Sequence, residues 1–222
     1  MAKSRAVQDY LKAIYELSDG GEAAATSAIA ERLQIAPGSV TGMLKRLAEQ
    51  DLVEHVPYYG TRLTAAGATE AVGMIRRHRV LELFLVQVLG YTWDRVHEEA
   101  ERLEHAVSDE LIDRMADVLG EPTLDPHGAP IPGVGVAFED LRYPALADVD
   151  TGALAVLRRV PDEDSDALRY LADLGLVPGV VIEVVDRAPL NGPLRLRVGG
   201  REHFVGHELA RSLQVERVDA AS

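Results

Sequence analysis

Apolar residues recur at helical spacing in three segments near the start of the chain. Residues 5–17, 28–33 and 40–49 each have one apolar face, which predicts three helices. A turn at 35–38 separates the second helix from the third, and Ser39 is placed to cap the third. Two short β-like runs follow, at 52–56 and 61–64, around a turn. The order helix, helix, turn, helix, hairpin is that of a winged helix-turn-helix, expected at residues 1–73.

The pattern changes twice further along the chain. Helical spacing continues from about residue 64 to 89 and again from about 92 to 119. This is more apolar surface than one small domain needs, so we expect a homodimer and a helical domain at 74–121. Prolines and glycines then predict an irregular tether at 122–150 rather than a packed element.

From about residue 151 the apolar period is two, as in β-strands. Five short runs and one helix, at 165–174, predict a small barrel over 151–222. The fold class is therefore mainly α with a β C-terminal domain.

In a winged helix-turn-helix the helix after the turn places its first residues on base edges in the DNA major groove. Small or hydroxyl side chains here permit close approach, and cations and the hairpin complete the expected surface. The expected DNA contacts are Pro37, Ser39, Thr41, Gly42, Lys45, Arg46, Tyr59 and Arg62. A protein-interaction module is the alternative, and the element order favours double-stranded DNA.

The net charge of −13 argues at first against a nucleic-acid partner. Residues 1–80, however, hold ten Lys and Arg against nine Asp and Glu, so the excess acidity lies elsewhere. The chain has no cysteine, which excludes disulfides and thiolate metal sites. No apolar run approaches the roughly 20 residues of a membrane span, so we expect a soluble, cytoplasmic protein without a membrane partner.

Ligand-type side chains share helix faces in the middle of the chain. His78 and Glu82 are four residues apart. A second set, predicted to lie on one helix face, comprises His97, Glu101, Glu104 and His105. Carboxylates gathered on a helix that also buries a face are costly unless a cation lies between them. The spacing therefore predicts metal binding.

Ligand chemistry narrows the metal. Imidazole and carboxylate without sulfur suit Mn²⁺ or Fe²⁺, although Zn²⁺ and other divalent ions would also bind such a set. An enzyme is the alternative from another class, but residues 97–101 match only half of the metalloprotease pattern H-E-x-x-H. We therefore expect no catalytic residues and no small-molecule substrate.

Several motifs resemble the diphtheria toxin repressor family of metal-activated repressors, and its manganese-responsive branch in particular. They are DYLKAIYEL (9–17), IAERL (29–33), PGSVTGMLKRL (37–47), RRHRVLELFL (76–85), HEEAERLEHAVSDE (97–110), PHGAPIPG (126–133) and LADLGLVPGVVIEVVDR (171–187). The resemblance is nearly end to end, and it implies a C-terminal SH3-like domain of the FeoA type.

The resemblance also implies two metal sites. The primary ligands would be Asp9, Glu101, Glu104 and His105, and the ancillary ligands His78, Glu82 and His97, with Glu163, Asp164 or Asp166 as further candidates. Iron-responsive members have Met at the position of Asp9 and Cys at that of Glu101, so carboxylates there imply manganese. One departure is Lys12, where short manganese-responsive members have Glu.

The sequence thus predicts a manganese-activated dimeric repressor of metal-homeostasis genes, such as manganese uptake genes. An iron-responsive regulator of the same family is the alternative. Metal shared between the first helix and the helical domain would fix the spacing of two recognition helices on the operator.

Overall fold

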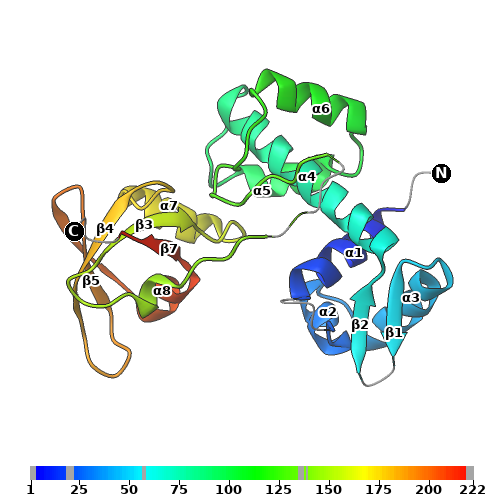
Figure 1. The fold of residues 1–222 in the computed structure, drawn as a ribbon, viewed down its shortest axis with the longest axis horizontal. Helices are drawn as coiled ribbons and strands as arrows, with labels where there is room; N and C mark the ends of the chain where they lie inside the picture. The colour runs from blue at the N-terminus through cyan, green and yellow to red at the C-terminus, as the bar shows by residue number, and fades with distance from the viewer. Residues whose placement is uncertain (1–3, 19–22, 57–58, 135–137, 139, 219–222) are drawn as a thin grey trace. The chain divides into compact units, whose positions relative to one another are not determined.

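The computed structural model describes residues 4–18, 23–56, 59–134, 138 and 140–218 (Figure 1). The chain forms two compact units. The first comprises residues 1–78, 104–109 and 132–138, and the second 79–103, 110–131 and 139–222. Among the described residues, no helix combines the length and the apolar character that crossing a membrane requires.

The first unit contains the predicted winged helix-turn-helix. Its elements are α1 (Arg5–Leu17), α2 (Thr26–Arg32), α3 (Pro37–Glu49), β1 (Val53–Val56) and β2 (Gly60–Leu63). The two strands pair antiparallel, with Val53 opposite Leu63. Leu11 and Ile14 of α1 are fully buried with Ile29 of α2 and Leu44 of α3, as their helical spacing predicts. Residues 57 and 58 of the predicted turn lie outside the described residues.

Helix α3 begins earlier than predicted. Pro37 is its first residue, Ala36 is the N-cap, and no side chain caps the helix. The predicted capping role of Ser39 is therefore wrong. Proline is favoured at the first helical position because its φ is already helical and it lacks an N–H that would be unsatisfied there.

The next helices are α4 (Ala65–Gln87), α5 (Val96–Leu103) and α6 (Asp109–Val118). The prediction of one helix from about 92 to 119 is wrong, because the chain leaves the helix after Leu103 and resumes it at Asp109. Ser108 directly precedes the new start, where serine is a favoured residue type. Glu104 and His105 consequently lie in a turn and not on the helix face that carries His97 and Glu101.

The described residues of the segment 122–150 are irregular, with one short 3₁₀ helix, η2 (Leu146–Asp148). Both ends of the segment are nevertheless packed, contrary to the expectation of a tether. Asp125, His127 and Ala129 are buried, and Leu146 is part of the C-terminal core. The prolines and glycines therefore shape a folded loop.

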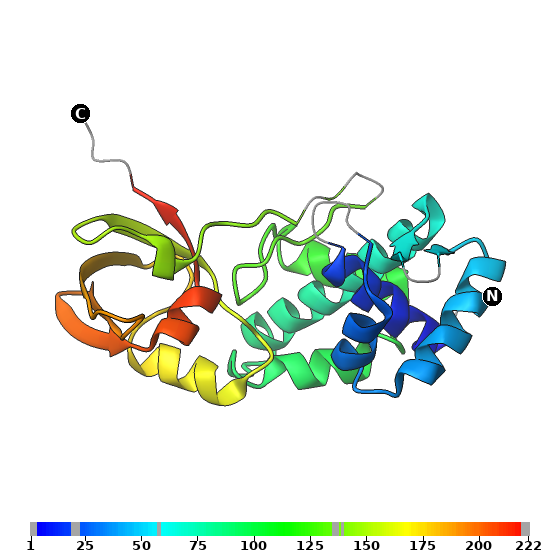
Figure 2. The ribbon, with the colours of Figure 1, turned by 90° about the horizontal axis from the view of Figure 1, so that it is seen from below.

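The C-terminal sheet has the strand order β6-β5-β4-β3-β7 and is antiparallel throughout. The strands are β3 (Leu154–Arg159), β4 (Val181–Arg187), β5 (Leu194–Val198), β6 (Arg201–Val205) and β7 (Gln214–Arg217), with helices α7 (Ser165–Asp173) and α8 (His207–Ser212). The sheet curls around the buried apolar positions of each strand (Figure 2). The fold class, mainly α with a β C-terminal domain, is confirmed.

Candidate metal centres

The start of α3 presents an open, polar surface. Pro37, Ser39, Thr41, Gly42, Lys45 and Arg46 are all exposed, as are Tyr59 and Arg62 of the hairpin. A Cβ atom added at Gly38 or Gly42 would meet nothing within 4 Å. The surface therefore has the small side chains, the cations and the free helix N-terminus that contact with a DNA groove requires.

The first cluster of metal-ligand side chains comprises Asp9, Glu104 and His105, all in the first unit. Nε2 of His105 lies 3.0 Å from Oδ1 of Asp9 and 3.5 Å from Oε1 of Glu104. One ligand atom from each residue lies within 4.8 Å of the other two. Helix α1 and the turn after α5 thus bring together residues from distant parts of the sequence.

Gln8 determines which nitrogen of His105 faces the cluster. Nδ1 of His105 donates to Oε1 of Gln8 at 2.8 Å. In a neutral ring Nε2 then carries a lone pair and faces two carboxylate oxygens. Among the described residues Nε2 is buried without a hydrogen bond. Lone pairs that face one another in this way are stabilised by a cation between them, so the cluster fits a divalent metal.

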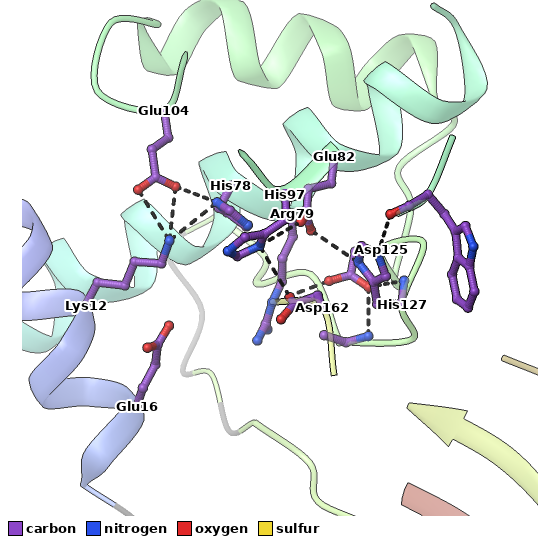
Figure 3. A network of polar contacts seen from close by, with 12 residues as sticks. Lys12, Glu16, His78, Arg79, Glu82, His97, Glu104, Asp125, His127 and Asp162 are labelled. Carbon is purple, nitrogen blue, oxygen red and sulfur yellow. Dashed lines mark hydrogen bonds and ion pairs between the residues drawn. The ribbon is translucent and has the colours of Figure 1, made fainter. Parts of the chain in front are cut away.

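Glu104 has two further neighbours in the first unit. Its carboxylate is fully buried, and it lies 2.7 Å from Nδ1 of His78. Nζ of Lys12 donates to both of its oxygens, at 3.2 and 3.3 Å, as Figure 3 shows. Glu104 therefore binds a side-chain cation in addition to belonging to the first cluster.

The second cluster comprises Glu82, Asp125 and His127, which are all buried in the second unit. Asp125 Oδ1 accepts from the backbone N–H groups of His127 and Ala129, at 2.8 and 2.9 Å. Nε2 of His127 donates to the carbonyl oxygen of Trp93 at 2.9 Å, and the two rings stack. Nδ1 of His127 is therefore the nitrogen that faces Oε2 of Glu82, 3.8 Å away (Figure 3).

The pKa values of Asp125 and His127 in the second cluster are strongly shifted. Burial, and then the neighbouring Glu82 carboxylate, raises the pKa of Asp125 to about 6, although His127 and Arg79 act in the opposite direction. Burial lowers the pKa of His127, but Glu82, Asp125 and Asp162 outweigh it and raise that pKa to about 9. In the described part of the chain, Oδ2 of Asp125 and Nδ1 of His127 are buried without hydrogen bonds. The cluster therefore also fits a divalent cation.

His97 and Asp162 lie next to the second cluster. Nδ1 of His97 is 3.4 Å from Oε1 of Glu82 and 3.9 Å from Oδ2 of Asp162 (Figure 3). Asp162 belongs to the loop between β3 and α7, so the C-terminal domain brings a carboxylate to this site. The second cluster thus has neighbours from α5 and from the loop of the barrel.

The sequence-predicted ligands divide between these places. Asp9, Glu104 and His105 come together, and so do Glu82 and His97. His78 contacts Glu104 and Lys12, and it also lies one helical turn before Glu82 on α4, so its predicted place with Glu82 and His97 stays a prediction. Half-buried Glu101 lies on α5 in the second unit, three residues before Glu104.

Two of the three acidic residues suggested as further ligands make other contacts. Asp164 is the N-cap of α7, and its side chain accepts from the backbone N–H groups of Asp166 and Ala167. Asp166 forms an ion pair with Arg169, and Glu163 is exposed. The neighbouring Asp162 is the carboxylate that reaches His97.

Sequence reasoning missed four residues of these sites: Gln8, Asp125, His127 and Asp162. The pattern Asp125-Pro126-His127 offered a signal, because two ligand types flank a proline in a short turn. The prediction of an irregular tether gives these residues no place in a site. Gln8 gave no signal, since it acts only through His105.

Comparisons with known proteins agree with the geometry. Residues 4–61 match the iron dependent repressor N-terminal DNA binding domain, and residues 64–133 match the iron dependent repressor metal binding and dimerisation domain. Residues 145–217 match the FeoA domain. Each part of the chain therefore corresponds to one domain of a single kind of regulator.

Similar proteins match over nearly the whole chain. The iron-dependent repressor IdeR of Mycobacterium tuberculosis is 32% identical, with 94% of this chain and 96% of that protein covered. The diphtheria toxin repressor of Corynebacterium diphtheriae is 29% identical over the same shares.

Solved structures agree as well. A manganese-dependent transcriptional repressor in complex with manganese is 36% identical, with a TM-score of 0.88 over 96% of this chain and all of that one. The manganese regulator SloR is 33% identical, with a TM-score of 0.77 over 96% of this chain and 98% of that one. The chain belongs to the diphtheria toxin repressor family of metal-dependent transcriptional repressors, which are DNA-binding regulators and not enzymes.

Proposed function

We propose that this protein is a repressor activated by Mn²⁺. The observation that carries the proposal is the first cluster, where Nε2 of His105 faces Oδ1 of Asp9 at 3.0 Å and Glu104 at 3.5 Å. These ligands are oxygen and nitrogen atoms, and the chain has no cysteine that could add a soft thiolate. Carboxylate and imidazole together suit Mn²⁺. The proposed ligands of the activating ion are Asp9, Glu104 and His105, with Glu101 as the fourth ligand that the family resemblance implies.

A second ion is proposed at the second cluster. Glu82, Asp125 and His127 are its ligands, with His97 and Asp162 beside them. Two buried carboxylates this close together repel each other, and a divalent cation removes that cost. Because Asp162 comes from the loop after β3, this ion would tie the C-terminal domain to the end of α4.

Activation follows from where the ligands of the first cluster stand in the chain. Asp9 lies on α1 of the winged helix-turn-helix, and Glu104 and His105 lie in the turn that leads directly into α6. A cation that these residues share restricts the motion of α1 relative to that turn. Metal would thereby favour one arrangement of the DNA-binding helices, through a higher affinity for the DNA-competent state.

The partners are operator DNA and a second copy of the chain. The exposed residues of α3 and the hairpin contact the operator, and the phosphate contacts are supplied by Lys45, Arg46 and Arg62. Three cations per chain are few, so binding by a dimer to two half-sites is needed for useful affinity. Such a regulator acts in the cytoplasm, and manganese uptake genes are its proposed targets.

Iron activation is the second candidate. Fe²⁺ accepts the same carboxylate and imidazole ligands, and the similar protein IdeR is named an iron-dependent repressor. The absence of cysteine favours manganese over iron, because soft sulfur ligands add more to iron binding than to manganese binding.

Fluorescence anisotropy separates these candidates. A labelled fragment of the protein's own upstream region is titrated with the full chain in chelator, in Mn²⁺ and, under anaerobic conditions, in Fe²⁺. We expect binding in Mn²⁺ at concentrations of free metal where Fe²⁺ gives less. Equal or stronger activation by Fe²⁺ would support the iron-responsive alternative. DNA binding that is equally strong in chelator and in either metal would contradict the proposal.

A further inference from the structure

Lys12 places a positive charge beside the first cluster. It lies on α1 three residues after Asp9, so both side chains leave the same face of the helix. Nζ of Lys12 lies 3.2 Å and 3.3 Å from the two oxygens of Glu104 and 3.4 Å from Nδ1 of His78. The lysine is 9% exposed, and Glu104 is fully buried.

This position is chemically unusual for a lysine. An ammonium group is strongly hydrated, and burying it costs free energy unless it is paired. Here it lies between a carboxylate and an imidazole nitrogen, which are both ligand types for a divalent metal (Figure 3). The ammonium therefore occupies a position that would otherwise suit a metal ion.

Charge counting shows what the ammonium does. Asp9, Glu104 and the proposed ligand Glu101 carry three negative charges, and Lys12 offsets one of them. A single divalent ion then brings these four side chains to a net charge of zero, and a further divalent ion would bring the group to +2. Like charges at these distances repel strongly where water is excluded.

We propose that Lys12 is a built-in cation that takes the place of a second divalent ion next to the first cluster. It limits that cluster to one ion, and it weakens the binding of this ion by competing for Glu104. It also holds the buried Glu104 carboxylate when no metal is bound. This inference rests on the proposed function, because it requires that the first cluster binds Mn²⁺.

The test compares four forms of the full chain: the parent, Lys12→Glu, Lys12→Met and Arg201→Glu. Bound Mn²⁺ per chain is measured by equilibrium dialysis with elemental analysis, and the affinity by isothermal titration calorimetry. Each variant is compared with the parent by the difference in bound Mn²⁺ per chain, so ions bound at other sites do not affect the result. Arg201→Glu makes the same change of charge at an exposed position of β6 and is the matched control.

We expect Lys12→Glu to bind one more Mn²⁺ per chain than the parent, because the new carboxylate would stand where the ammonium was. Lys12→Met should bind the same number of ions as the parent, and the ion at the first cluster about tenfold more tightly, since a competing like charge is gone. Without metal, Lys12→Met should melt at a lower temperature than the parent, and Mn²⁺ should raise its melting temperature more. Arg201→Glu should match the parent throughout.

Unchanged stoichiometry in Lys12→Glu together with unchanged affinity in Lys12→Met would overturn the inference. So would a failure of both variants to fold even in Mn²⁺, because Lys12 would then be required for folding itself. Asp9→Ala in the same assay separates this from the proposed function. If Asp9→Ala loses one ion while the Lys12 variants match the parent, only the role of Lys12 is wrong; if Asp9→Ala loses none, both proposals fail.

Discussion

Nδ1 of His127 lies 3.8 Å from Oε2 of Glu82, and both side chains are almost completely buried. His127 comes from the loop after α6, and Glu82 from α4. The other ring nitrogen is committed to the carbonyl oxygen of Trp93. A proton or a metal ion on Nδ1 is therefore what stabilises the buried Glu82 carboxylate at this side, and the two compete for the same nitrogen.

The metal-free protein should lose stability as pH rises. The pKa of His127 is raised from 6.5 to about 9, so its contribution is complete below about pH 6.5 and is lost between there and about pH 9. Asp125 acts in the same direction between about pH 4 and 6, because its raised pKa makes the folded protein keep the proton. Urea unfolding in chelator at several pH values measures this dependence.

His127→Gln should flatten the profile between about pH 6.5 and 9, while His203→Gln on β6 should leave it unchanged. An unaltered slope in His127→Gln would show that another group causes the loss. In the parent, Mn²⁺ binding should strengthen over the same range, because the metal must displace the proton from His127.

Gly128→Ala should destabilise the loop that carries the second cluster. Gly128 has a φ of +89°, and a Cβ atom there would lie 1.9 Å from the carbonyl oxygen of Arg158 in β3. The loop must therefore move away from the strand. We expect a loss of about 2 kcal/mol or more in the free energy of unfolding, measured by urea denaturation.

Gly90→Ala is the control for backbone strain. Gly90 also has a positive φ, +72°, but its Cβ atom would meet nothing within 4 Å. Gly90→Ala should therefore lower the free energy of unfolding by only the roughly 1 kcal/mol that the left-handed backbone conformation costs a residue with a Cβ atom. Equal losses in the two variants would mean that the contact between Gly128 and β3 does not matter.

Gly42→Gln should separate folding from DNA binding. An exposed glycine inside a helix lowers stability by roughly 0.5–1 kcal/mol, and space is open around position 42, so the variant should be more stable than the parent. The larger side chain stands on the surface expected to meet the groove, so operator affinity should fall by about tenfold or more. Gly73→Ala on α4, which also has open space, should gain stability and keep operator affinity. Unchanged operator binding in Gly42→Gln would contradict the assigned DNA surface.

Metal preference should follow the softness of the ligands. Asp9→Met combined with Glu101→Cys replaces two hard oxygen ligands by sulfur, which should favour Fe²⁺ relative to Mn²⁺. Anaerobic anisotropy titrations give the ratio of the two metal concentrations at half-maximal operator binding. A ratio equal to that of the parent would show that these two positions do not select the metal.

Much of the fold follows from local patterns. The helical spacing of Leu11 and Ile14 predicts the buried face of α1, and the alternation of Leu194, Leu196 and Val198 predicts β5. Both predictions are confirmed because each element buries one face against its own unit, and that face sets the spacing of its apolar residues. Helix α8 was not predicted, since six residues are too few to establish a period.

The break between α5 and α6 could not be read from spacing. His97, Glu101, Glu104 and His105 keep a helical period across it, although the last two stand in a turn. The second cluster was missed for a different reason. Asp125 and His127 meet Glu82 only through the tertiary packing of an irregular loop, and no local period records such a contact.

The central claim is that Asp9 and His105 hold the ion that activates DNA binding. The most direct test is the anisotropy of labelled upstream DNA with Asp9→Ala, in saturating Mn²⁺ and in chelator, beside the parent and the exposed control Asp117→Asn on α6. The account predicts Mn²⁺-dependent binding by the parent and the control, and the loss of that dependence in Asp9→Ala while its circular dichroism spectrum is retained. Mn²⁺-dependent binding by Asp9→Ala with the affinity and the metal requirement of the parent would contradict it.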